Sequence, residues 1–78
     1  MGKKVYKYNK VLCRHFGKKI NNIRKNLQIT QEKLAFRSNI SPSYLSAIER
    51  GITDTTISTA NRISKALDVN LVDLFISE

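Results

Sequence analysis

The most informative side chains in this 78-residue chain are four that share one face of a predicted helix: Ser43, Ser46, Ala47 and Arg50. Their spacing of i, i+3, i+4 and i+7 places them on one side of a helical turn. A solvated helix face usually carries Lys and Glu, whereas this one carries two hydroxyls, a methyl group and a guanidinium. Side chains this small let a helix axis lie close to another surface. The major groove of DNA is such a surface, and its base edges offer partners for Ser, Ala and Arg.

The residues around this face predict the helix that positions it. Ser41 is a good N-cap because its hydroxyl can accept a hydrogen bond from a free N–H of the first turn. Pro42 follows at the first helical position, where its fixed φ suits a helix. The opposite face is apolar and is expected to face the core: Leu45, Ile48 and Ile52.

A second short helix is predicted directly before the first, over residues 30–38. Thr30 is its expected N-cap, and Glu32 lies where a carboxylate favours the positive end of the helix dipole. Asn39 stands where the chain must turn sharply, and Asn tolerates a left-handed conformation. A helix, a tight turn and a capped helix within about 20 residues are typical of a helix-turn-helix motif.

Two longer runs extend this pattern. The first is Thr30-Gln31-Glu32-x-Leu34-Ala35 with Ile40-Ser41-x-x-Tyr44-Leu45-Ser46-x-Ile48-Glu49-Arg50-Gly51, and the second is Ile57-x-Thr59-x-x-x-Ile63-x-x-Ala66-Leu67-x-Val69-x-Leu71-x-x-Leu74-Phe75. Together they resemble the Cro/C1-type (phage repressor, XRE-like) helix-turn-helix family over about residues 16–75. The resemblance implies a compact, all-α, five-helix lambda-repressor-like domain. It also implies a homodimeric regulator of transcription that binds a palindromic operator in double-stranded DNA, such as a restriction–modification controller or a prophage or plasmid repressor.

The chain departs from the family pattern at three turn and cap positions. Asn39 and Asp68 stand where the family often has Gly, and Pro42 stands where controllers often carry a polar or basic side chain. The two turn residues are compatible with the fold. Pro42 leaves a base contact at that position without a side chain to make it.

Candidate DNA contacts divide into base-facing and phosphate-facing residues. Ser43, Ser46 and Ala47 are the base-facing positions, and Arg50, at the far end of the helix, is expected to favour phosphate over a base. The resemblance implies that Gln31, at the start of its helix, bonds a backbone phosphate; the alternative is an ordinary surface amide. The other candidates are Tyr44, which can be buried, contact DNA or do both, and Arg37 and Lys33, for which solvated charge is the simpler interpretation.

Glu49 falls on the core side of its predicted helix, where an unpaired carboxylate would be costly. Arg24 lies at the edge of the apolar stripe of the first predicted helix. The repressor family pairs an Arg and a Glu at the matching positions, so the resemblance implies a partly buried Arg24–Glu49 ion pair. Its expected role is structural, namely to hold the recognition helix against the first helix.

The remaining elements follow from apolar periodicity and capping signals. We expect a first helix over residues 9–26, the end of the third helix at Gly51, a fourth helix capped by Thr56, and a fifth capped by Asn70 with Asp73 completing a capping box. The expected apolar faces are Leu12, Phe16, Ile20, Ile23 and Leu27 on the first helix, and Ile57, Ala60, Ile63 and Leu67 on the fourth. On the last helix, the core candidates are Leu71, Leu74 and Phe75. The exposed pair Val72 and Ile76 indicates either a self-complementary dimer patch or scattered surface hydrophobes.

The charge of the chain is large and uneven, at +8 overall. Residues 1–31 hold nine Lys or Arg and no acid, whereas residues 32–78 hold five basic and six acidic side chains. This predicts attraction to polyanions. We expect residues 1–8 to be a flexible basic segment and residues 9–78 to be one domain, with the motif at about 31–50. The basic segment is either solvated or lies against DNA phosphates.

Other function classes find little support. Cys13 and His15 are the only Cys and His, so a disulfide scaffold or a metal site with ordinary ligand spacing is not expected, and neither is enzymatic activity. Cys13 is expected to fill a small space in the core, and His15 to lie at the surface or its edge. No cofactor, small-molecule ligand or membrane segment is expected, and the predicted location is the cytoplasm. The alternative function is a protein-interaction module, such as an antitoxin that masks its partner.

Overall fold

The structure, a computed structural model, describes residues 9–76; the predicted basic segment, residues 1–8, lies outside this range, as do residues 77 and 78. The elements, in chain order, are α1 (Lys10–Asn26), α2 (Gln31–Ser38), α3 (Pro42–Glu49), α4 (Ile57–Ala66) and a 3-10 turn, η1 (Leu71–Leu74). The described part of the chain contains no β-strand. The prediction of an all-α fold is therefore confirmed.

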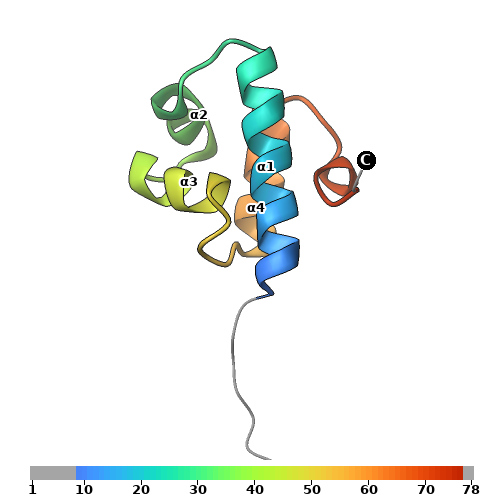
Figure 1. Ribbon diagram of the computed structural model, residues 1–78. Helices are drawn as coiled ribbons and strands as arrows, with labels where there is room; N and C mark the ends of the chain where they lie inside the picture. Colours follow the sequence, from blue (N-terminus) through green and yellow to red (C-terminus); the bar gives the residue numbers. More distant parts are fainter. Residues whose placement is uncertain (1–8, 77–78) are drawn as a thin grey trace, which may run out of the picture.

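The long helix α1 organises the other elements (Figure 1). In that view α2 and α3 lie on one side of α1, α4 lies behind it, and η1 lies on the other side. α1 packs against α3 and η1, α2 packs against α3 and α4, and α4 packs against η1. The helix α3 is therefore supported by both α1 and α2.

Each α-helix begins at a residue whose side chain accepts a hydrogen bond from the first turn, where backbone N–H groups have no partner within the helix. Asn9 accepts from Leu12 N at 2.9 Å. The other three caps are those predicted: Thr30 accepts from Lys33 N, Ser41 from Tyr44 N, and Thr56 from Thr59 N, each at 3.0 Å. Local capping chemistry thus sets where each helix starts.

Positive-φ residues set where the helices end. Asn39 and Asp68 both adopt φ 59°, so both turn residues take the left-handed conformation that Gly adopts most easily. Gln28, which the sequence did not single out, does the same at φ 60°. Gly51 has φ 71°, and a Cβ atom there would lie 2.7 Å from Arg14 Cα. Glycine is required at this position by both backbone conformation and space.

The buried core lies where the helix centres meet: Phe16, Ile20, Leu34, Ala35, Leu45, Ile48, Ala60, Ile63, Leu67 and Leu74. Four residues that the sequence assigned to apolar faces are instead substantially exposed: Leu12 (47%), Leu27 (50%), Ile52 (51%) and Ile57 (79%). They lie in the first turn of a helix or just beyond its last residue. Helix crossings bury the middle of a stripe and leave its ends open, so a periodic pattern overestimates the core there.

The prediction that the last element is an α-helix is wrong. Its residues form the short 3-10 turn η1, and the Asn70 side chain makes no capping hydrogen bond, so the predicted capping box with Asp73 is absent. Asp73 N instead donates to Asn70 O at 3.0 Å, and Phe75 N donates to Val72 O at 3.0 Å. Four residues cannot repay the cost of nucleating an α-helix, and the tighter i→i+3 bonding is the common outcome for such a short segment.

Candidate nucleic-acid interface

The helix α3 has two faces of opposite character. Leu45 and Ile48 are 0% and 1% exposed and anchor its back to the core. On the other side, Ser43 and Arg50 are exposed, and Ser46 and Ala47 are half-buried. The Arg50 side chain lies along the helix, where its Nε donates to Ser46 O at 3.3 Å. The four predicted groove-facing residues therefore share a shallow, small-residue surface.

Glu49, the last residue of α3, is the centre of a buried polar network. Its Oε2 accepts from Arg24 Nε at 2.7 Å, and its Oε1 accepts from Arg24 Nη2 at 3.0 Å, from Asn21 Nδ2 at 2.8 Å and from Gln31 Nε2 at 3.0 Å. The side chains of Arg24 and Glu49 are only 11% and 2% exposed. Arg24 Nη1 also donates to Ile29 O at 2.8 Å. One carboxylate thus connects α1, the start of α2 and the end of α3.

The surroundings of Glu49 change its pKa in opposing directions. Burial alone would raise the pKa, because it disfavours the charged carboxylate. Hydrogen bonds from Arg24, Gln31 and Asn21, with the charge of Arg24, outweigh burial and hold the pKa of Glu49 below its usual value. The network therefore favours the ionised form.

Gln31 lies at the first position of α2, where free backbone N–H groups and the helix dipole favour an anion. Its amide nitrogen carries two hydrogens, and one of them is directed to Glu49. The carboxylate therefore fixes the orientation of this amide, which sequence reasoning treated as independent.

The other candidate DNA contacts occupy different settings. Lys33 and Arg37 are exposed on α2. Tyr44 is half-buried on α3, and its hydroxyl donates to Asp54 O at 3.2 Å in the loop that follows the helix. Tyr44 thus holds this loop beside α3 while its ring packs against the core.

Three residues that sequence reasoning missed position this interface. A Cβ atom on Gly17 would lie 2.1 Å from Ile48 O, so glycine is what lets α1 cross α3 this closely. Asn21 completes the Glu49 network. Arg62 on α4 donates from Nε to Ser38 O at 3.0 Å and so caps the C-terminal end of α2. A glycine inside a helical pattern was a usable signal of close approach, whereas the partners of Asn21 and Arg62 depend on how the helices cross.

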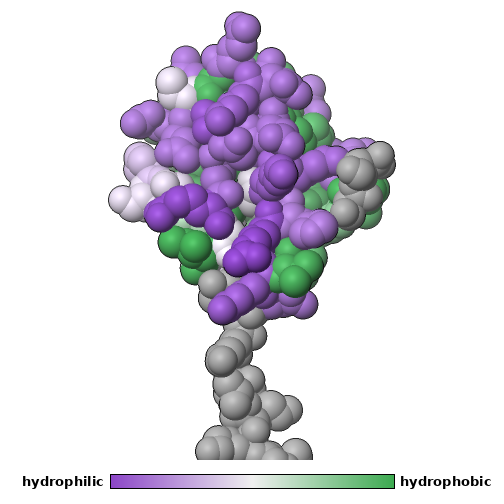
Figure 2. Space-filling view, in the orientation of Figure 1, coloured by the Kyte–Doolittle hydropathy of each residue, from purple (hydrophilic) through white to green (hydrophobic). Residues whose placement is uncertain are grey.

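The C-terminal turn carries the predicted dimer residues. Val72 and Ile76 are 61% and 44% exposed. Phe75 was expected in the core but is also 44% exposed; it stacks on Phe16, with ring centroids 5.0 Å apart. The short η1 turn leaves Phe75 at the edge of the core, so the surface formed by Val72, Phe75 and Ile76 is more apolar than the sequence predicted. Figure 2 shows the hydropathy of the face of the molecule that is seen in Figure 1.

Two remaining expectations concern Cys13 and His15; His15 is exposed, as expected. Cys13 is half-buried rather than a core filler, and its Sγ donates to Asp54 Oδ1 at 3.6 Å. Within residues 9–76, no three His, Cys, Asp or Glu side chains gather closely enough to hold a metal ion. None of the helices in this range is long and apolar enough to cross a membrane.

Comparison with known proteins places this geometry in a family. Residues 20–74 match a helix-turn-helix family model of the Cro/C1 type. Control protein C.BamHI of Bacillus amyloliquefaciens is 42% identical over 60 residues, which cover 76% of this chain and 74% of that protein. The immunity repressor of Bacillus phage phi105 is 38% identical over 55 residues, covering 70% of this chain and 38% of the repressor.

Solved structures of restriction–modification controller proteins have the same fold. The restriction–modification controller protein C.AhdI of Aeromonas hydrophila superimposes with a TM-score of 0.79 at 30% identity, covering 81% of this chain and 96% of that one. The wild-type controller C.Esp1396I gives a TM-score of 0.77 at 36% identity, with 86% and 87% covered. The family and these relatives are regulatory DNA-binding proteins rather than enzymes. The chain belongs to the Cro/C1-type helix-turn-helix family of DNA-binding regulators.

Proposed function

We propose that this protein is a homodimeric transcriptional regulator that reads a two-fold-symmetric operator in double-stranded DNA, as a restriction–modification controller. The observation that carries the proposal is that α3 has two different faces. Leu45 and Ile48 on one face are buried, whereas the opposite face carries the small, accessible side chains of Ser43, Ser46 and Ala47. Such a helix can enter a major groove without backbone hindrance. The similarity to controller proteins supports the type of regulator.

Base readout in this proposal rests on Ser43, Ser46 and Ala47. Hydroxyls can donate or accept, so they discriminate weakly, and Ala47 can contact a thymine methyl. Arg50 lies at the end of α3, where it is suited to a phosphate. Because these contacts distinguish few bases, part of the specificity is assigned to DNA shape and deformability.

Phosphate contacts set the position of the helix on the duplex. Gln31 is the principal one, since it sits at the N-terminus of α2 and its amide is oriented by Glu49. Tyr44, Lys33 and Arg37 are further candidates. Tyr44 lies on α3 itself, and Lys33 and Arg37 are exposed on the adjacent helix α2, where they can contact the DNA backbone beside the groove.

A dimer is proposed because one eight-residue helix contacts about half of an operator. Two-fold pairing places the two recognition helices one DNA turn apart, about 34–36 Å. Val72 and Ile76 are exposed on the C-terminal turn and are assigned to this contact. Sedimentation of the V72E/I76E variant tests the assignment; a monomer with an unchanged melting temperature is expected, and an unchanged dimer would refute it.

Selection from a randomised duplex pool at about 0.15 M salt, near physiological ionic strength, tests the function. We expect the bound fraction to yield a two-fold-symmetric consensus. If no sequence is enriched and binding only fades as salt rises, the chain is a non-specific basic domain, and a protein partner of the antitoxin kind becomes the leading alternative.

The Arg50 assignment has its own matched test. On the selected operator, Arg50→Gln should reduce the slope of log K against log salt by about 1.8, the value for one phosphate contact in each half of the dimer. Lys65→Gln removes an equal charge from the exposed end of α4 and should leave the slope nearly unchanged. Equal changes in the two variants would show that Arg50 acts only through net charge.

A further inference from the structure

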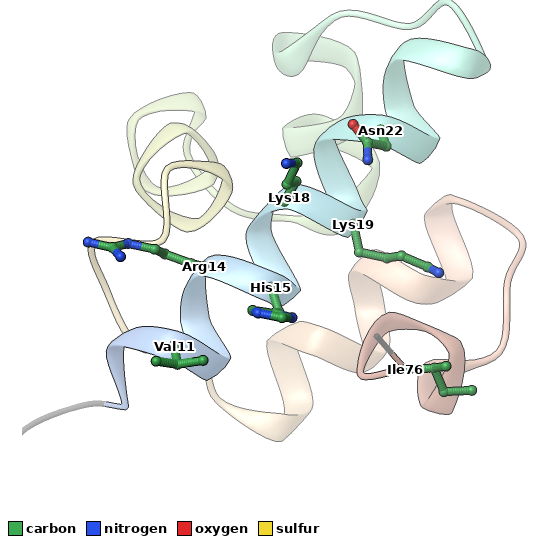
Figure 3. A pocket seen from close by; sticks show the side chains of 7 residues that line it. All are labelled: Val11, Arg14, His15, Lys18, Lys19, Asn22 and Ile76. Carbon is green, nitrogen blue, oxygen red and sulfur yellow. The ribbon is translucent and has the colours of Figure 1, made fainter. Parts of the chain in front are cut away.

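A groove of about 620 Å³ runs along the outer side of α1 (Figure 3). We call it the α1 groove. Residues of α1 and Ile76 line it, and Figure 3 shows Lys19 extending toward the C-terminal turn that carries Ile76, whereas Arg14 extends to the other side of α1. Its volume falls within the range of about 300–1,000 Å³ that is usual for binding sites.

Most of the α1 groove lies away from the surface that supports α3. Its lining residues on α1 recur at spacings of three and four, so they form one stripe along the helix. Gly17 points at the backbone of α3, and His15 and Lys19 lie about 160° around the helix from it. Arg14, by contrast, lies against Gly51 at the end of α3. An occupant held on the His15 and Lys19 side of the α1 groove does not need to displace DNA from α3.

The charge of the α1 groove has one sign. The 17 residues of α1 include no acidic side chain, and Arg14, Lys18 and Lys19 form no ion pair with any residue in the described range 9–76. Arg14 and Lys18 are four residues apart, and like charges at this spacing destabilise a helix. An ordinary solvated face alternates its charges. A face of uniform sign gains most from an anionic partner.

The walls of the α1 groove identify the class of that partner. Val11 and Ile76 line it and are 66% and 44% exposed, so apolar surface lies directly beside the cations. Figure 2, in the orientation of Figure 1, shows strongly hydrophilic side chains along the front of the molecule with apolar patches on both sides of them near its lower end. A phosphodiester backbone presents no apolar group to Val11 and Ile76. A protein segment can carry carboxylates and aliphatic side chains together.

We propose that the α1 groove docks an acidic, partly aliphatic segment of a protein partner. Carboxylates of the segment pair with Arg14, Lys18 and Lys19, and an aliphatic side chain covers Val11, which leaves the dimer contact assigned to Ile76 in place. The stripe from Val11 to Asn22 spans about 17 Å along the helix axis. An extended segment of about five or six residues matches that length.

The test uses a fluorescein-labelled peptide of about eight alternating Glu and Leu residues, measured by anisotropy at about 0.15 M salt. Lys18→Gln/Lys19→Gln should weaken binding of this peptide by at least about tenfold. Lys25→Gln/Lys65→Gln is the control, because it removes the same charge from exposed sites outside the α1 groove. Melting curves of both double variants show that each is folded under the assay conditions.

Two further measurements separate the charged from the apolar contribution to peptide binding and test for nucleic-acid binding. Val11→Ser should weaken binding of the Glu–Leu peptide but not of a Glu–Ser peptide, because only the former has an aliphatic group to bury against Val11. The proposal is overturned if wild type does not bind the Glu–Leu peptide, or if the control variant loses as much affinity as Lys18→Gln/Lys19→Gln. It is equally overturned if a non-operator duplex displaces the peptide and loses the same affinity in Lys18→Gln/Lys19→Gln, since the α1 groove then binds nucleic acid.

Discussion

Replacing Glu49 with alanine is expected to remove much of the stability of this domain. The change deletes the acceptor of four hydrogen bonds and leaves the Arg24 guanidinium, 11% exposed, without its counter-charge. Breaking a buried pair by removing one partner costs about 3–5 kcal/mol. A domain of this length has a total stability of about 4–12 kcal/mol, so the loss is a large fraction of the whole.

The assay is thermal and urea unfolding followed by circular dichroism. A loss of about 3 kcal/mol corresponds to a fall in melting temperature of at least about 12 °C for a domain of this size. Glu32→Ala is the matched control, because Glu32 is exposed on α2 and should cost less than about 1 kcal/mol. Where Glu49→Ala is too unstable to measure, Glu49→Gln keeps the shape of the side chain and should show a smaller loss.

The reasoning would be refuted if Glu49→Ala lost no more stability than Glu32→Ala. That result would mean that the pair behaves like an exposed ion pair, with a contribution of about 0–1 kcal/mol. A second check is Arg24→Met/Glu49→Leu, which replaces both charges with apolar groups. It should recover much of the loss, because the main cost of the single change is an unpaired buried charge.

Three further predictions concern pH, packing and thiol chemistry. Folding lowers the pKa of Glu49, so its stabilising effect is complete above the unfolded pKa of about 4.3 and is lost as pH falls through the folded value. The free energy of unfolding, measured by urea titration at several pH values, should therefore fall less steeply with acid in Glu49→Gln than in wild type. Gly17→Ala should destabilise the fold by at least about 1–3 kcal/mol, whereas a helix-centre Gly→Ala normally stabilises, because the new Cβ would meet Ile48 O; a gain in melting temperature would contradict this. Burial, and then the hydrogen bond and charge of Asp54, raise the pKa of the Cys13 thiol, so iodoacetamide should alkylate it more slowly at pH about 8 than an unperturbed thiol of pKa about 8.5. Asp54→Ala should speed the reaction. Equal alkylation rates in wild type and Asp54→Ala would rule out a role for Asp54.

Local signals in the sequence were sufficient for the motif itself. Ser41, Thr30 and Thr56 are caps because a short hydroxyl side chain next to a helix start has few other low-energy arrangements. Asn39 takes a left-handed conformation because the helices must reverse direction there. These features depend on neighbours within four residues, so they can be predicted without knowledge of the fold.

Features that depend on how helices cross were harder to predict. Ile57 belongs to the apolar stripe of α4 but is 79% exposed, since it begins the helix. The hydrogen bond from Gln31 to Glu49 joins residues 18 positions apart and requires the actual angle between α2 and α3. Arg62 finds Ser38 O for the same reason. Periodicity identifies a face, but it does not identify which side chains meet across an interface.

The two-faced character of α3 has a consequence for how regulators of this kind can diverge. Leu45, Ile48 and Glu49 are buried and hold α3 to the rest of the fold, whereas Ser43 is exposed and is not part of the core. Under the proposed function, substitutions at exposed positions such as Ser43 change target preference at little cost in folding. A lineage can acquire a new operator through a few mutations on one helical face, and paralogues within one cell can be insulated from one another while their scaffold remains the same.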